Sequence, residues 1–251
     1  IDKTQLTCFY KYDYTQSGLR SVRKLIDTMM LEIGNKSCKF YSYHNYIVDS
    51  ILRNSDRGTW MLYKTTPNKY TVYTNYPENK TTVIDNALGT LTYFEYVENF
   101  EIPKWNILNE TQEILSHPCK KATCRFRGRD YIAWYAIDIP ISRGPYKFAG
   151  LPGLIMKISD TENLYSFECV GIEKANKPMY KDKKEGIETI PTSREEFTRI
   201  KKRFYENPKA TVEVALKNSG INFDELMEQA KERNVEIPNN AIKNYNPIEL
   251  E

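Results

Sequence analysis

An alternation of apolar and polar residues with a period of two runs through most of the first 175 residues, and it constrains the fold more than any other feature. Near the start, Leu6, Cys8, Tyr10 and Tyr12 occupy every second position. Successive side chains of a β-strand point to opposite faces, so this pattern is typical of strands with one buried face. The 19 tyrosines fit because aromatic rings pack well on a pleated surface. The sequence therefore predicts a mainly β fold.

Turn signals divide this region into strands. Residues 70–75 and 81–85 flank a Pro-Glu-Asn turn, and Gly128 separates two alternating runs, so both places predict tight hairpins. Further strands are predicted over 91–97, 105–108, 113–115, 119–126, 131–137, 154–159 and 165–172. Consecutive hairpins favour a curved antiparallel sheet or half-barrel.

Helical spacing occurs in two regions. Residues 43–53 carry apolar positions at helical spacing, and we expect this helix to lie across the concave face of the sheet. After about Lys174 the chain becomes charged, and Ser193 with Glu196 forms a capping-box pattern that starts a helix ending near residue 207. Further helices are predicted over 211–217 and from 222–224. We therefore divide the chain into a β domain over 1–175 and a charged helical C-terminal extension over 176–251.

Charge and hydropathy exclude several classes of protein. The 36 basic and 33 acidic residues give a net charge of +3, too small to predict nucleic-acid binding. Apolar runs such as 131–135 are too short for a transmembrane span, so we expect a soluble domain. Residue 1 is not Met and no signal-like segment follows it, so either the chain was trimmed or a targeting peptide was removed.

The five cysteines leave at least one thiol unpaired within the chain. We expect them to act as small buried hydrophobic residues, with long-range disulfides as the alternative in an oxidising compartment.

A segment rich in glycine and proline follows the last hairpin. Three glycines and two prolines lie within residues 144–153, and this composition cannot continue a strand. The sequence predicts a stiff, non-repetitive loop that carries Tyr146 and Phe148, followed by a strand from Leu154.

Residues 150–155 read Gly-Leu-Pro-Gly-Leu-Ile, with Cys119, Trp134 and the Ile-Pro-Ile-Ser run over 139–142 in order before them. In these motifs the sequence resembles the GLPGLI family, of the Porph_ging type, from about Leu6 to Ile172. The resemblance implies an exported Bacteroidota protein of the periplasm or outer membrane, often encoded near TonB-dependent outer-membrane receptors. It implies no catalytic residues and no cofactor.

The loop and the preceding strand suggest a recognition surface. Its candidate residues are Trp134, Tyr135, Tyr146, Phe148, Leu151 and Pro152, which would form an aromatic lip that binds a peptide, a lipid or an outer-membrane receptor. The alternative is a corner of the sheet whose apolar residues fill the core.

Enzymatic and metal sites have weaker signals. The two histidines are His44 and His117, and the sequence has no H-E-x-x-H, G-x-S-x-G or phosphate-binding loop. His117 and Cys119 are spaced to face the same way on a strand, as in a thiolate–imidazole pair or two metal ligands. The arginines of residues 125–130 suggest either an anion site or a solvated turn. We expect no metal and no cofactor.

These observations favour a non-enzymatic accessory or binding protein of the periplasm or outer membrane, with an outer-membrane receptor or transporter, a peptide or a lipid as partner. A hydrolase or peptidase assembled from distant strands, a lipid or lipoprotein carrier, and a purely structural envelope protein are the alternatives.

Overall fold

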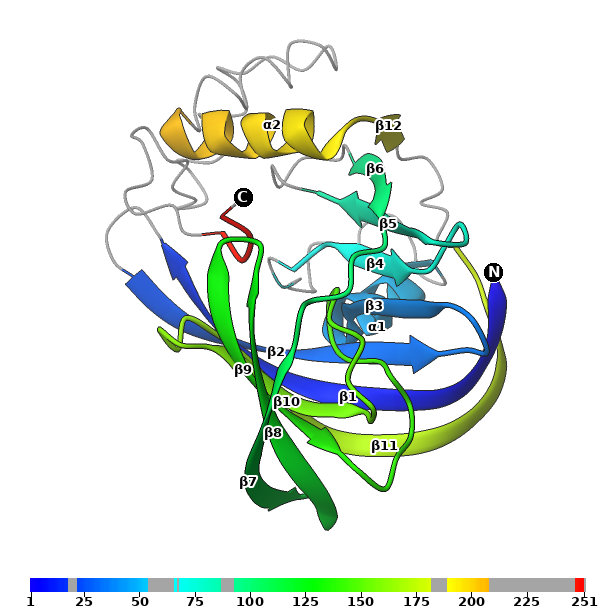
Figure 1. The fold of residues 1–251 in the computed structure, drawn as a ribbon. Coiled ribbons are helices and arrows are strands. Elements are labelled where there is room, and N and C mark those ends of the chain that lie inside the picture. The colour runs from blue at the N-terminus through cyan, green and yellow to red at the C-terminus, as the bar shows by residue number, and fades with distance from the viewer. Residues whose placement is uncertain are drawn as a thin grey trace.

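The computed structural model of the protein describes residues 1–17, 22–53, 66, 68–86, 93–181, 189–207 and 247–250. The described strands form one open 12-stranded sheet in the order β12-β6-β5-β4-β3-β2-β1-β11-β10-β9-β8-β7. All neighbours pair antiparallel except β12, which runs parallel to β6. The sheet curls so that the turn between its strands β8 and β9 reaches β6 on the other arm, and the result is a half-barrel (Figure 1). The predicted fold class is confirmed.

The first half of the chain forms one arm and the floor of the half-barrel. It contains β1 (Asp2–Ser17), β2 (Val22–Ile33), β3 (Cys38–Ser42), α1 (Tyr43–Arg53), β4 (Thr71–Thr74), β5 (Lys80–Asp85) and β6 (Tyr93–Asn99). The alternation read from β1 is real, because Cys8, Tyr10 and Tyr12 are all buried whereas Lys11 is exposed. The hairpin predicted around the Pro-Glu-Asn turn is formed by β4 and β5.

The second half forms the other arm and closes the top. It contains β7 (Asn106–Ile114), β8 (His117–Phe126), β9 (Arg129–Ala136), β10 (Ile155–Asp160), β11 (Tyr165–Met179), β12 (Thr189–Pro191) and α2 (Arg194–Glu206). The hairpin predicted at Gly128 is confirmed, with positive φ at both Arg127 (49°) and Gly128 (80°). The two short strands expected over 105–108 and 113–115 are one strand, β7, interrupted by a bulge after Ile107.

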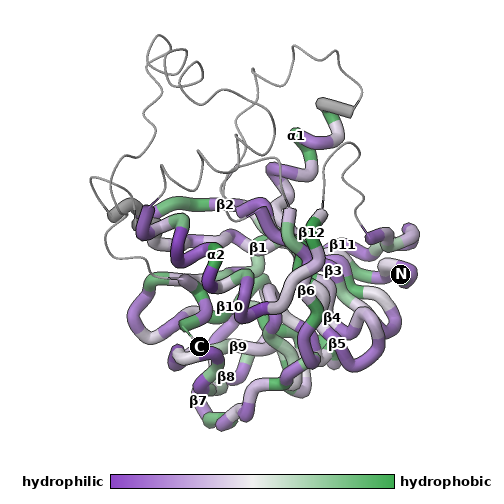
Figure 2. Tube along the Cα trace, turned by 90° about the horizontal axis from the view of Figure 1, so that it is seen from above, coloured by the Kyte–Doolittle hydropathy of each residue, from purple (hydrophilic) through white to green (hydrophobic). Residues whose placement is uncertain are grey.

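The core fills the concave side of the sheet with aromatic rings. Tyr12 stacks on Phe167 with ring centroids 4.3 Å apart, and Phe148 packs on Tyr131 at 4.8 Å. All five cysteines are buried and free, which confirms their expected role as small hydrophobic residues. Seen from above, hydrophobic and hydrophilic residues are interspersed along the strands (Figure 2).

The position expected for the first helix is wrong. The ring of Tyr43 packs against Phe9, and that of Tyr46 packs against Tyr41. Phe9 and Tyr41 alternate with the core residues Tyr10 and Phe40, so α1 lies on the outer face of the sheet. The concave face is already filled by strand side chains, which leaves only the outer face for this helix.

The segment over residues 144–153 has no regular secondary structure, as its glycines and prolines predict. A Cβ on Gly153 would overlap the carbonyl oxygen of Ala136, so the backbone passes too close to β9 for any side chain. Gly150 has φ of 99°, a conformation that favours glycine. The segment is therefore a fixed corner packed against the sheet.

Beyond residue 175, the described residues join the same sheet and core. The hydroxyl of Ser193 accepts a hydrogen bond from the Glu196 N–H, and α2 ends at Glu206 with Asn207 as its C-cap, which confirms the predicted helix. Phe197 of α2 packs on Phe94 and Tyr96 and so covers the open side of the half-barrel. The helices expected over 211–217 and from 222–224 lie outside the described residues. None of the described helices is both long and apolar enough to cross a membrane.

Candidate functional site

A cavity of about 190 Å³ lies between the concave face of the sheet and α2. Seven tyrosines contribute to its walls, namely Tyr12, Tyr14, Tyr70, Tyr96, Tyr146, Tyr165 and Tyr205. Asp85, Arg194, Lys201 and Glu249 add charged groups to the same walls. An engineered protein cavity of about 150 Å³ holds a benzene molecule, so this one has room for a group of that size.

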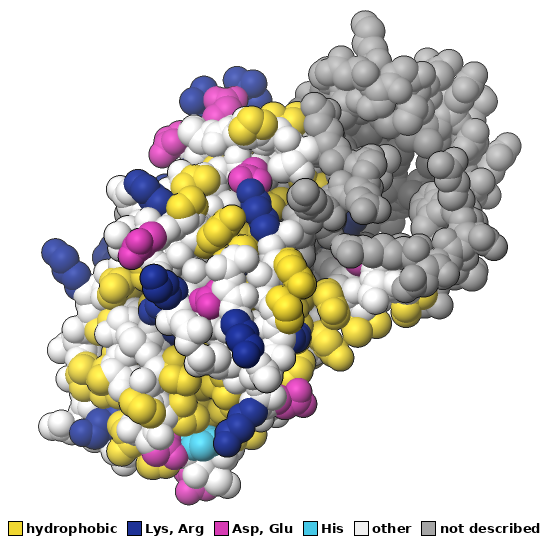
Figure 3. All heavy atoms as spheres, turned by 90° about the vertical axis from the view of Figure 1, so that its right-hand side faces the viewer, with side chains coloured by type: hydrophobic (Ala, Val, Ile, Leu, Met, Phe, Trp, Pro, Cys, Tyr) yellow, Lys and Arg dark blue, Asp and Glu magenta, His cyan; other side chains and the backbone are white. Residues whose placement is uncertain are grey.

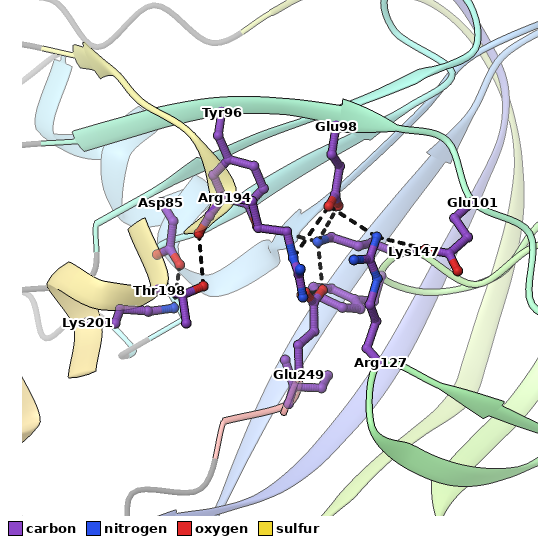
Figure 4. Close-up of polar contacts among 12 residues, drawn as sticks. Asp85, Tyr96, Glu98, Glu101, Arg127, Lys147, Arg194, Thr198, Lys201 and Glu249 are labelled. Atoms are coloured by element: carbon purple, nitrogen blue, oxygen red, sulfur yellow. Dashed lines mark hydrogen bonds and ion pairs between the residues drawn. The ribbon is translucent and has the colours of Figure 1, made fainter. Parts of the chain in front are cut away.

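A cluster of buried ions lies at one side of the cavity (Figure 4). Lys147 Nζ is 2.6 Å from Glu98 Oε1 and 2.6 Å from Glu249 Oε1. The Tyr146 hydroxyl donates to the same Glu249 oxygen at 2.5 Å. Arg194 reaches the other Glu249 oxygen, with Nε at 3.1 Å and Nη2 at 3.0 Å. Both carboxylate oxygens of Glu249 are therefore held by cations.

The corner segment turns Tyr146 and Lys147 inward together. Tyr146 has φ of 57°, an uncommon backbone conformation for a residue with a side chain. In a regular strand, neighbouring side chains would point to opposite faces, but here both are buried. The Lys147 ammonium also lies over the rings of Tyr146 and Tyr96, at 5.3 and 5.4 Å from their centroids.

Electrostatics fix the charge state of Glu249. Burial alone would raise its pKa, but the ammonium of Lys147, the hydroxyl of Tyr146 and the guanidinium of Arg194 bring the pKa down to about 2. Burial would lower the pKa of Arg194, and the Glu249 carboxylate raises it instead. Glu249 is therefore a carboxylate at neutral pH.

Arg127 ties the two arms of the half-barrel together. It sits in the β8–β9 turn, and its Nη2 is 3.1 Å from Glu98 Oε2 and 2.9 Å from Glu101 Oε2. Glu98 belongs to β6 on the opposite arm. Two distant ends of the sheet thus meet at the ion cluster.

Residues 247–250 enter the half-barrel beside this cluster. Arg129 Nη2 donates to the carbonyl of Pro247 at 2.8 Å, and the Tyr131 hydroxyl donates to that of Ile248 at 3.2 Å. The N–H of Leu250 donates to the carbonyl of Arg127 at 3.0 Å. These contacts reach the backbone of the segment, whereas the Glu249 carboxylate is the charged side chain that the segment adds to the ion cluster.

The six residues predicted for the recognition surface lie in different environments. Tyr146 lines the cavity, Phe148 and Leu151 are in the core, and Tyr135 is buried. Trp134 is half-buried, with Lys121 over its ring at 5.9 Å, and Pro152 is exposed. The structure thus brings Tyr146 to the cavity and leaves the other five away from its walls.

The proposed His117–Cys119 pair is not assembled. His117 Nδ1 lies 2.8 Å from Asp138 Oδ2, and the Cys119 thiol donates to the backbone carbonyl of His117. Burial raises the pKa of the Cys119 thiol to about 11, so little thiolate is present at neutral pH. Among the described residues, no three His, Cys, Asp or Glu side chains gather as metal ligands would.

The arginines of the β8–β9 hairpin divide between surface and interior. Arg125 pairs with Asp130 in solvent. Arg127 and Arg129 turn inward instead, and Arg129 pairs with the buried Asp160 at 3.2 Å. On the face in Figure 3, basic and acidic side chains are interspersed, with hydrophobic ones between them.

Sequence reasoning missed Glu98, Lys147, Arg194 and Glu249. One signal was available, since Lys147 stands alone between Tyr146 and Phe148 in a segment expected to be rigid. Glu249 lies among mostly uncharged residues, in a stretch with no distinguishing pattern.

Comparisons with known proteins agree with the fold. Residues 126–157 match the sequence model of a family described as "Protein of unknown function (Porph_ging)", so the predicted resemblance to that family is confirmed for this segment. No curated protein sequence matches the chain. Two structures of PNGF-II in different crystal forms are similar to it, with TM-scores of 0.53 and 0.50 and 13% identity. The similarity covers 78% of this chain and 32% of PNGF-II, so the chain spans about a third of that protein. At this identity the similarity concerns the fold alone.

Proposed function

We propose that this chain is a non-enzymatic, exported envelope protein that binds a ligand on the concave side of its half-barrel. The observation that carries the proposal is the cavity of about 190 Å³ with tyrosines on its walls. Small-molecule sites are concave and mostly apolar, with a few directed polar groups. Tyrosine supplies an apolar ring and a hydroxyl together, so this cavity suits a ring or side chain that carries a polar group.

Similarity to the Porph_ging family supports the compartment. We place the protein in the periplasm or at the outer membrane, with an outer-membrane receptor or transporter as candidate partner. In a fractionated cell we expect the protein with the envelope, and recovery from the cytosol alone would contradict this placement.

Two alternatives have less support. A lipid carrier is disfavoured because Asp85, Arg194, Lys201 and Glu249 line the same cavity. A cysteine hydrolase is disfavoured because Cys119 and His117 are not paired through their side chains.

The cavity can be tested with 4-fluorophenol, a neutral ring of suitable size, titrated into the protein and followed by ¹⁹F NMR. Val83 lines the cavity and is buried, so Val83→Phe should fill it and weaken binding at least tenfold. Val97 on β6 is exposed and lies outside this cavity, so Val97→Phe is the matched control and should bind like wild type. Equal binding by all three proteins, or no saturable binding, would reject the proposal.

A further inference from the structure

We propose that Lys147, Arg194 and Tyr146 form a receptor for the carboxylate side chain of an extended acidic peptide, and that residues 247–250 occupy it as an intramolecular ligand. This inference rests on the proposed function, because it assigns a ligand class to the same concave side of the half-barrel.

The charges of the cluster balance only when Glu249 is included. Without Glu249, the cations Lys147, Arg194 and Arg127 would share Glu98 and the more exposed Glu101. The Lys147 side chain is only 3% exposed with Glu249 in place, and without Glu249 the largely buried Glu98 would be the main partner of three cations. A buried cation without a partner is strongly unfavourable. The site is therefore built for one additional carboxylate, whichever molecule supplies it.

The geometry of the receptor is the second argument. One Glu249 oxygen takes the Lys147 ammonium and the Tyr146 hydroxyl, while the other takes the Arg194 guanidinium. Hydrogen bonds in which the donor or the acceptor is charged are stronger than those between neutral groups, and they require a defined orientation. A glutamine at this place would lose the charge, and its amide nitrogen would face a cation. The receptor thus selects a carboxylate over an amide.

The contacts to the segment's backbone are the third argument. Arg129 and Tyr131 donate to the carbonyls of Pro247 and Ile248, and the Arg127 carbonyl accepts from the Leu250 N–H. Arg129 is itself fixed by the buried Asp160. Main-chain contacts are available to any extended peptide, whatever its side chains. The half-barrel therefore contacts the backbone of the segment at three residues and binds one acidic side chain.

The space beside the segment is the fourth argument. Pro247, Ile248 and Glu249 form part of the cavity wall, and about 190 Å³ next to them remains unfilled. The intramolecular segment thus occupies only part of the concave side. A peptide with a larger apolar residue beside its acidic one would fill the tyrosine-walled space as well.

The test uses the full chain and the acetylated, amidated peptide Asn-Pro-Ile-Glu-Leu, whose sequence is that of residues 246–250. With a fluorescent label, its binding is measured by anisotropy. We expect Glu249→Ala, which empties the carboxylate site and leaves residues 247–250 held by main-chain contacts alone, to bind it at least tenfold more tightly than wild type does. The same peptide with Gln in place of Glu should bind Glu249→Ala at least tenfold more weakly. Glu168→Ala removes an exposed carboxylate paired with Lys157 and should behave like wild type.

Equal binding of the Glu and Gln peptides to Glu249→Ala, or no binding of either, would overturn the inference. If Glu249→Ala does not fold in buffer, refolding is repeated with propionate or with chloride at equal ionic strength. Recovery of the fold with propionate alone supports a carboxylate receptor, and failure of both salts contradicts it. Dodecanoate tests whether the carboxylate comes from a fatty acid and not from a peptide. Tighter binding of dodecanoate than of the peptide would reject the peptide as ligand.

The two proposals can fail separately. If 4-fluorophenol binds in the cavity but the acidic peptide does not bind to Glu249→Ala, the ligand-binding function stands and the ligand class is wrong. If neither binds, the concave side is not a binding site.

Discussion

Lys147 Nζ lies 2.6 Å from Glu249 Oε1 inside the half-barrel. Lys147 comes from the rigid corner over residues 144–153, and Glu249 comes from the last described segment of the chain. Desolvation offsets much of the attraction in such a buried pair, so its net contribution to stability is small when both partners are present. Removing either residue, however, leaves the buried charge of the other without its partner. The ion cluster therefore couples the corner, α2 and residues 247–250.

Lys147→Met should destabilise the protein by about 3–5 kcal/mol, because Glu98 and Glu249 would then face each other with less compensation. Urea unfolding measures the effect. The double variant Lys147→Met/Glu249→Gln should recover at least about 1 kcal/mol of this loss, since the two sites interact directly. A cost below about 1 kcal/mol for Lys147→Met would show that the pair is not buried as described.

Stability should fall in acid through Glu249. Its pKa is about 2 in the folded protein and 4.5 as the ordinary value, so the folded state holds the proton more weakly. The stabilisation is therefore complete above about pH 4.5 and is lost as the pH falls towards 2. The whole effect is at most about 3.5 kcal/mol, at about 1.4 kcal/mol for each tenfold change in proton affinity. Chemical unfolding of wild type and Glu249→Gln between pH 2 and 4.5 measures this loss of stability. If the free energy of unfolding of the two proteins changes in parallel with pH, Glu249 does not contribute to it.

Gly153→Ala should cost at least about 2 kcal/mol, because its new methyl group would overlap the carbonyl oxygen of Ala136 and force the corner away from β9. Gly171 in β11 is the matched control. A Cβ there meets Phe9 at 3.6 Å, an ordinary contact, so Gly171→Ala should be neutral or slightly stabilising. Similar unfolding midpoints for both variants would contradict the close approach at Gly153.

The thiols should react slowly in the folded protein. Burial raises the pKa of Cys119 and Cys169 to about 11 and that of Cys124 to about 12. At pH 8 we expect iodoacetamide to label none of the five within the time that labels an introduced Thr161→Cys, whose position is exposed. Mass spectrometry counts the labels, and all five native thiols should react in denaturant. Rapid labelling of Cys119 would contradict this prediction and would support a catalytic role for its thiol.

The sequence predicted the elements whose signals are local. Alternation over Leu6–Tyr12 identified β1, Gly128 identified the hairpin turn and Ser193 identified the start of α2. Each depends on a few neighbouring residues and on backbone preferences that act before the chain folds. The corner was predictable for the same reason, since glycine and proline restrict the backbone wherever they stand.

The sequence could not predict contacts between distant segments. Tyr146 was recognised as an aromatic residue on a rigid loop, but its partner Glu249 is separated from it by 103 positions. The packing of α1 on the outer face also depends on distant residues, because rings such as Phe40 and Phe167 fill the concave side. The charged C-terminal extension likewise gave no sign that Arg194 and Glu249, which are 55 positions apart, face each other inside the half-barrel.

The most direct test of the central claim is the titration of the Glu249 carboxyl carbon by ¹³C NMR, with Glu249→Gln used to assign the signal. A carboxylate held by Lys147, Arg194 and Tyr146 should titrate with a pKa of about 2. A pKa near the ordinary 4.5 would mean that Glu249 is in solvent, that the receptor is not occupied by residues 247–250, and that the account of this site is wrong.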